Sequence, residues 1–279
     1  MEGVFKKLKT RIPTNTFEKM KRNRIFLVGL VIFLCLLFSS KPASKYPKLI
    51  RWKKDNSIMV LIPAGEFWMG SSKKPNEAPR HKVYLKDFYI DKYEVTTTQY
   101  LKFCQETGHR PPYYLRKAIP KGKENHPVQH ISWYDADAYC RWAGKRLPTE
   151  AEWEKAARGT DGRIYPWGNF WDPTRSNNRT TPYKNTTPVG SYPQGASPYG
   201  VMDMAGNVWE WTTDWYKSYP SAPKKFDETG KYKVTRGGAF FFSIDLLRTS
   251  ARNPLPPDDI SEYNGFRCAV DADKIRIKK

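Results

Sequence analysis

The feature that most constrains the fold is a stretch, residues 159–266, in which no long helical periodicity occurs. Gly, Pro, Asn and aromatic residues dominate it, and the whole chain holds 18 Gly and 22 Pro in 279 residues. This composition excludes a helical bundle, while 15% aromatic residues exclude a disordered polyampholyte. We expect short strands, few helices and long ordered loops.

Regular patterns occur in the remaining segments. Residues 83–90 alternate apolar and polar side chains, which predicts one half-buried strand, and residues 57–62 form a short apolar run. Helices are predicted over 96–107, 132–143 and 149–158, where Thr149 and Glu152 have the spacing of a capping box. The expected class is α+β with little regular secondary structure.

The N-terminal residues have the pattern of a membrane anchor. Residues 1–24 contain eight Lys or Arg, and the uncharged apolar run 25–38 follows. By the positive-inside rule, 1–24 is expected to be a basic cytoplasmic tail, 25–40 a transmembrane signal-anchor and 41–56 a linker. The later residues are then expected in the periplasm or outside the cell. Because the run is short, a cleaved signal peptide is the alternative, but a small-residue cleavage site is missing.

The same segment explains most of the basic charge. Residues 1–54 carry a net charge of +12, out of +20 for the whole chain. Since the excess clusters beside the apolar run, we expect contact with the membrane bilayer and no nucleic acid partner.

A series of motifs occurs along the rest of the chain. It includes PAGEFWMGS (63–71), GKRLPTEAEWEKAARG (144–159), GNVWEWTTDWY (206–216), TRGGAF (235–240) and NGFRCA (264–269). Together they resemble the formylglycine-generating enzyme family, also called sulfatase-modifying factors, over residues 57–271. The resemblance implies one domain with a C-type-lectin-like fold, followed by a basic tail at 272–279.

The resemblance also implies where reactive residues should stand. In the generating enzymes, two cysteines after the RGG motif bind Cu(I), a soft ion that prefers sulfur, and oxidise a cysteine of a sulfatase. Here the positions of the family's serine and two cysteines hold Ala239, Phe242 and Leu247, and residues 236–252 contain no cysteine. No catalytic residue and no copper are therefore expected.

Two stabilising features are implied by the family. The loop 203–211 is expected to bind structural calcium through Asp203, Gly206, Val208 and Glu210, which suits an ion that prefers carboxylate and carbonyl oxygens. The alternative is that Glu210 caps a helix or forms a salt bridge in the core. Cys140 and Cys268 match positions that form a disulfide in some members, the alternative being two buried free thiols.

These features lead to one functional expectation and two alternatives. We expect a membrane-anchored, extracytoplasmic domain without catalysis, acting as a binding or accessory subunit with other protein subunits of a membrane-associated complex. The first alternative is a formylglycine-generating or related metal-dependent oxidase acting on protein substrates. The second is a carbohydrate or peptide binder that uses exposed aromatic residues such as Phe240, Phe241 and Phe242.

Overall fold

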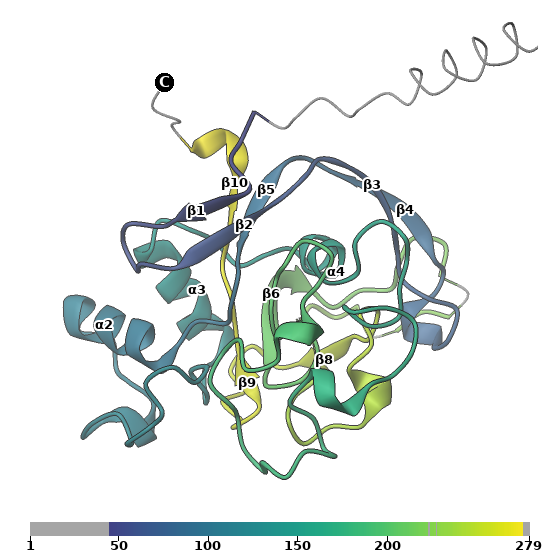
Figure 1. Ribbon diagram of the computed structural model, residues 1–279. Coiled ribbons are helices and arrows are strands. Elements are labelled where there is room, and N and C mark those ends of the chain that lie inside the picture. The colour runs from purple at the N-terminus through teal and green to yellow at the C-terminus, as the bar shows by residue number, and fades with distance from the viewer. Residues whose placement is uncertain (1–44, 223, 227, 276–279) are drawn as a thin grey trace, which may run out of the picture. The chain divides into compact units, whose positions relative to one another are not determined.

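Short strands form three sheets in a computed structural model that describes residues 45–222, 224–226 and 228–275 (Figure 1). The first sheet has the order β1–β2–β5–β10 and is antiparallel; its strands are Leu49–Arg51, Ile58–Ile62, Phe88–Asp91 and Ala269–Asp271. The strands β3 (Gly65–Met69) and β4 (His81–Leu85) form a separate antiparallel pair. The third sheet has the order β8–β7–β6–β9, with strands Asn253–Leu255, Lys233–Arg236, Trp209–Trp215 and Asn264–Gly265. In this sheet β6 and β9 run parallel.

The helices confirm the three segments expected from the sequence. They are α2 (Thr97–Thr107), α3 (Trp133–Trp142) and α4 (Glu150–Arg158). Each begins with a complete capping box, in which the N-cap hydroxyl accepts a bond from the N3 amide and the N3 side chain bonds back to the N-cap amide. Short 3₁₀ helices occupy parts of the loops: Pro75–Glu77, Tyr113–Leu115, Pro173–Arg175, Pro193–Gly195, Ile244–Leu246 and Ala272–Lys274.

One predicted element is wrong in its extent. The alternating residues 83–90 form parts of two strands, β4 and β5, which belong to different sheets and are separated by Lys86 and Asp87. All four residues of β5 are buried, because apolar clusters cover both of its faces. The alternation predicted for a half-buried strand therefore holds in β4 alone.

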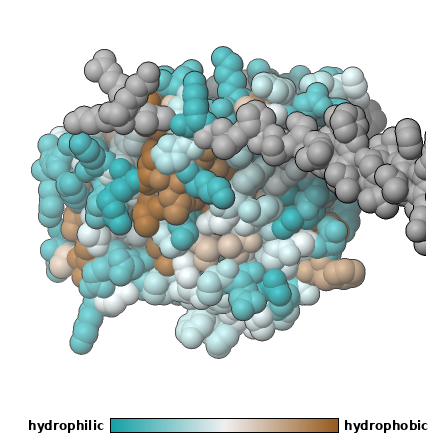
Figure 2. All heavy atoms as spheres, turned by 45° about the horizontal axis from the view of Figure 1, so that its top comes forward, coloured by the Kyte–Doolittle hydropathy of each residue, from teal (hydrophilic) through white to brown (hydrophobic). Residues whose placement is uncertain are grey.

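The first sheet separates two apolar clusters. On one face, Val60, Ile62, Phe88 and Ile90 pack with Trp153 of α4. On the other face Met59, Leu61, Tyr89 and Val270 form a smaller cluster with Tyr46. Figure 2 brings forward the side of the domain where this sheet lies in Figure 1, and apolar side chains gather there among hydrophilic ones.

A third cluster joins the helices to the end of the chain. Tyr100 and Phe103 of α2 and Tyr139 of α3 pack against Phe266 and Trp211. Cys104 lies in this cluster, as expected for a small core residue on the apolar face of α2. Residues from the C-terminal part of the chain thus complete a core to which α2 and α3 also contribute.

Both ends of the domain differ from the sequence boundaries. Strand β1 lies within residues 41–56, where we expect a linker, and pairs with β2. After β10, Ala272 of the expected tail is buried in the cluster below Tyr89. The predicted tail 1–24 and anchor 25–40 lie outside the described residues. Among the described residues, no helix has the length and apolar character needed to span a bilayer.

Candidate functional site

The loop after β7 carries the three positions that the resemblance assigns to the family's reactive side chains. Ala239 and Leu247 are completely buried, and Phe242 is half-buried. Gly238 allows the loop to fold, because its φ is +73° and a Cβ there would lie 2.6 Å from the Leu247 side chain. At these three positions the side chains are therefore those of Ala, Phe and Leu, in place of a hydroxyl group and two thiols.

Aromatic rings surround this position. The Phe242 ring lies 5.6 Å from Trp209 and 5.3 Å from Tyr263, both edge-on, and Tyr263 also contacts Phe240 and Phe241. We call Phe240, Phe241, Phe242 and Tyr263 the aromatic cluster. Phe240 is buried, whereas 51% of Phe241 is exposed. The expected exposure is thus confirmed for Phe241, is only partial for Phe242 and is wrong for Phe240, which lies in the core.

Beneath the cluster, two buried polar atoms have no hydrogen-bond partner among the described residues. They are the indole Nε1 of Trp209, on β6, and the amide Oδ1 of Asn264, on β9. These residues are direct partners in the parallel β6–β9 pair. A buried donor or acceptor without a partner costs about 1–3 kcal/mol, and both atoms lie inside the domain, since Trp209 is 1% exposed and Asn264 is 0% exposed.

The expected calcium residues lie in a second place, the acidic cluster. It consists of Glu94, Asp203 and Glu210, together with Arg267. Arg267 donates to both oxygens of Glu210, at 2.6 and 2.7 Å, and the Trp153 indole donates to Glu210 Oε2 at 2.7 Å. The salt bridge that we kept as the alternative for Glu210 is therefore present.

Electrostatics in the acidic cluster nonetheless fit a cation. Burial raises the pKa of Asp203 to about 6, and the nearby charge of Glu210 adds to the effect. Burial, followed by the charges of Asp203 and Glu210, raises the pKa of Glu94 well above its usual range. Glu94 Oε1 is buried without a partner, and Glu210 Oε1 accepts only the bond from Arg267, which leaves a lone pair.

In the described part of the chain no group of three or more His, Cys, Asp or Glu is placed to hold a metal, and this includes Glu94, Asp203 and Glu210. Asp203, the Gly206 and Val208 carbonyls and Glu210 have the oxygen chemistry that calcium prefers. The calcium site itself stays a prediction.

The two cysteines named for a disulfide lie side by side as thiols. Cys140 and Cys268 are fully buried, unbonded and hydrogen-bonded to each other. Burial raises the pKa of both thiols. Lys145 lies nearby, between Asp55 at 2.8 Å and Asp91 at 2.7 Å. The structure thus brings together the pair that a disulfide requires, and its formation stays a prediction.

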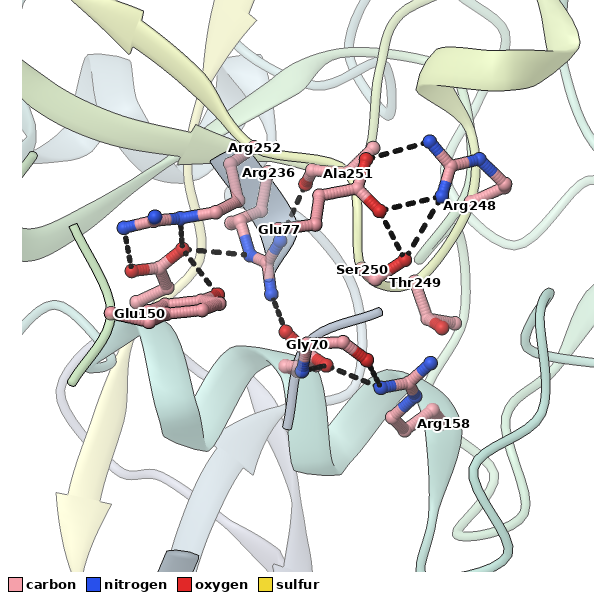
Figure 3. A network of polar contacts seen from close by, with 12 residues as sticks. Gly70, Glu77, Glu150, Arg158, Arg236, Arg248, Thr249, Ser250, Ala251 and Arg252 are labelled. Atoms are coloured by element: carbon pink, nitrogen blue, oxygen red, sulfur yellow. Dashed lines mark hydrogen bonds and ion pairs between the residues drawn. The ribbon is translucent and has the colours of Figure 1, made fainter. Parts of the chain in front are cut away.

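Sequence analysis missed a third buried group, the arginine–glutamate network (Figure 3). It comprises seven residues: Glu77, Glu150, Glu154, Arg158, Arg236, Arg248 and Arg252. Arg248 forms two bonds of 2.6 Å with Glu77, and Arg252 bonds both oxygens of Glu150 at 2.6 and 2.9 Å. Glu154 joins Arg158 at 2.6 Å and also contacts Arg236.

The sequence contains a spacing signal for three residues of this network. Glu150, Glu154 and Arg158 are spaced by four residues, which places them on one face of α4. Their partners Arg236 and Arg252, and the separate pair of Arg248 with Glu77, involve distant parts of the chain, so spacing alone does not identify them.

Comparison with known proteins supports the fold and the family that the motifs indicate. A family model described as "Sulfatase-modifying factor enzyme 1-like domain" matches residues 47–272. The formylglycine-generating enzyme of Mus musculus is 34% identical over 280 residues, covering 76% of this chain and 75% of that protein. The enzyme of Streptomyces coelicolor is 36% identical over 283 residues, covering 77% and 89%.

The solved structure of PvdO from Pseudomonas aeruginosa superposes with a TM-score of 0.70 at 28% identity, covering 82% of this chain and all of that one. The fold and the family match thus define a formylglycine-generating-enzyme-like domain. The chain belongs to the sulfatase-modifying factor family, as the motifs predict.

Proposed function

We propose that this chain is a non-catalytic member of its family that binds an extended polypeptide at the aromatic cluster. One observation carries the proposal: the position of the reactive thiols is occupied by Phe242, which is packed between Trp209 and Tyr263. Oxidation through a copper thiolate needs sulfur at this position. Cys104, Cys140 and Cys268 are buried thiols elsewhere, each with a pKa raised first by desolvation.

A polypeptide is the ligand that suits the place. The exposed Phe241 ring offers apolar surface to a neighbouring side chain. The generating enzymes that this chain resembles act on a protein substrate, which makes a polypeptide the expected class of ligand.

We further propose that the domain is anchored by residues 25–40 with its N-terminus in the cytoplasm, and acts as an accessory subunit of a membrane-associated complex. The basic flank of residues 1–24 supports this orientation. Structural calcium at the acidic cluster is part of the same proposal, supported by the unpartnered Glu94 oxygen.

Peptide display on the purified domain tests the binding proposal. We expect peptides with apolar side chains to be enriched, and Phe241→Ser to abolish the enrichment. The matched control is Phe170→Ser, since Phe170 is an exposed phenylalanine outside the aromatic cluster. Failure to enrich any peptide, or equal enrichment by both variants, would contradict the proposal.

The alternative of a metal-dependent oxidase acting on protein substrates has a separate test. Metal analysis of the purified protein distinguishes it, because copper or iron in stoichiometric amount would support an oxidase. Calcium alone would support the binding domain.

A further inference from the structure

An open cavity of about 170 Å³ lies beside the arginine–glutamate network, and its lining includes no residue of the aromatic cluster. The loop after β3 supplies Ser72 and Arg80, the end of α4 supplies Arg158, and the loop before β8 supplies Arg248 and Ser250. Its volume exceeds that of a single water, whose share of the liquid is about 30 Å³. Seven of its ten lining residues are polar or cationic.

The charge around this cavity is unbalanced toward the positive. The buried network joins four arginines to three glutamates. Two carboxylates lie next to the arginines of the cavity wall, Glu77 against Arg248 and Glu154 against Arg158. The wall also contains Lys73 and Arg80, for which the described part of the chain supplies no acidic partner.

A buried donor is available at the base of the cavity. Arg158 is only 4% exposed, and its Nη1 donates to Glu154 and to the Gly70 and Trp68 carbonyls. Its Nη2 makes no hydrogen bond within the described residues, and in Figure 3 this nitrogen points away from Gly70. A guanidinium edge held rigidly by three acceptors is well arranged to bind an oxyanion.

Arg80 provides a second donor at the rim. Its guanidinium lies 5.0 Å from the centre of the Trp68 ring, and a Cβ on Gly162 would lie 2.6 Å from its Nη2. The glycine thus leaves room for Arg80 to lie over the cavity. Stacking on an aromatic face leaves the in-plane N–H groups of a guanidinium free to donate.

We propose that this cavity binds a small tetrahedral oxyanion, phosphate or sulfate, between Arg158 and Arg80. The anion would offset the positive surplus of the network and accept the hydrogen bonds that Arg158 Nη2 leaves unmade. The proposal is independent of the polypeptide-binding function, since the two sites share no residue.

Calorimetric titration of the full chain with inorganic phosphate and with sulfate, at constant ionic strength, tests the proposal. We expect saturable binding that Arg80→Gln weakens by about tenfold, as the loss of one charge-assisted hydrogen bond implies. The matched control is Lys82→Gln, because Lys82 also lies over the Trp68 ring, at 5.7 Å, but does not line the cavity. It removes the same charge and should leave the affinity unchanged.

A further titration with glycerol phosphate distinguishes a free anion from an esterified one. Tighter binding of glycerol phosphate would identify a phosphomonoester as the natural source, whereas tighter binding of inorganic phosphate would identify the free anion, and both support the site. No saturable binding by any probe, or equal weakening by Arg80→Gln and Lys82→Gln, would overturn it.

Discussion

The arginine–glutamate network and the acidic cluster are both buried and are built from the same kinds of group, but they have opposite imbalances. Four arginines meet three glutamates in the network, whereas three carboxyl groups meet Arg267 in the acidic cluster. Buried charges are tolerated when they are paired, and an unpaired remainder favours an ion of opposite sign. If both proposed sites bind their ions, one domain offers an anion site and a cation site with nearly the same residue types.

The largest expected effect tests the paired part of the network. Glu154→Ala leaves Arg158 and Arg236 without their shared carboxylate, so we expect the free energy of unfolding to fall by about 3–5 kcal/mol. Denaturant titration measures the loss. Glu66→Ala is the control, because the ion pair of Glu66 with Lys82 is solvent-exposed and should contribute little. Similar losses in both variants would show that burial does not set the strength of these pairs.

The next effect concerns the two cysteines beside Lys145. A disulfide between Cys140 and Cys268 should stabilise the domain by about 2–4 kcal/mol, because it would close a long loop in the unfolded chain. Peptide mass mapping without reduction should find Cys140 linked to Cys268 and Cys104 as a free thiol. Complete alkylation of Cys140 and Cys268 in unfolded but unreduced protein would contradict the disulfide.

Chelation tests the carboxyl-rich side of the comparison. If calcium binds only the folded state, a hundredfold excess over its Kd stabilises the domain by about 2.7 kcal/mol. Chelator should therefore lower the melting temperature of the wild type, but hardly that of Asp203→Ala or Glu210→Ala. Glu210→Ala should also be less stable than Asp203→Ala, because it removes the partner of Arg267.

An unchanged wild-type melting temperature on chelation would contradict the calcium site. If Glu210→Ala were nevertheless destabilised, the salt bridge to Arg267 would account fully for the role of Glu210.

The smallest effect on stability at neutral pH concerns His126, which is buried beside the cationic Lys123. Burial, followed by the charge of Lys123, lowers the pKa of His126 to about 4. Since the unfolded imidazole titrates near 6.5, the unfolded state binds more protons between about pH 4 and pH 6.5. Stability should therefore fall as the pH drops through this window, and His126→Gln should reduce the slope. An identical slope in the variant would show that His126 does not contribute.

Local signals explain why the helices were predicted well. Thr96, Ser132 and Thr149 all act as N-caps, because a hydroxyl with a Gln, Asp or Glu three residues later satisfies amides that any helix leaves open. The strand prediction failed at residues 83–90, where two sheets meet, because alternation does not reveal which sheet a residue joins.

Only part of the candidate site could be predicted from the sequence. The resemblance to the family gives Ala239, Phe242 and Leu247 as the positions of its serine and two cysteines, and this assignment stays a prediction. The sequence did not show that Tyr263 packs on Phe242, or that Glu77 pairs with Arg248, because these contacts join loops far apart in the chain. Only the folded chain brings such residues together.

The most direct test of the central claim is incubation of the purified protein with a cysteine-containing peptide, Cu(I) and oxygen. Mass spectrometry follows conversion of the cysteine to formylglycine, and elemental analysis follows the bound metal. With Phe242 at the position of a thiol, we expect no conversion and no stoichiometric copper. Conversion of the peptide with copper bound at one equivalent would contradict the account.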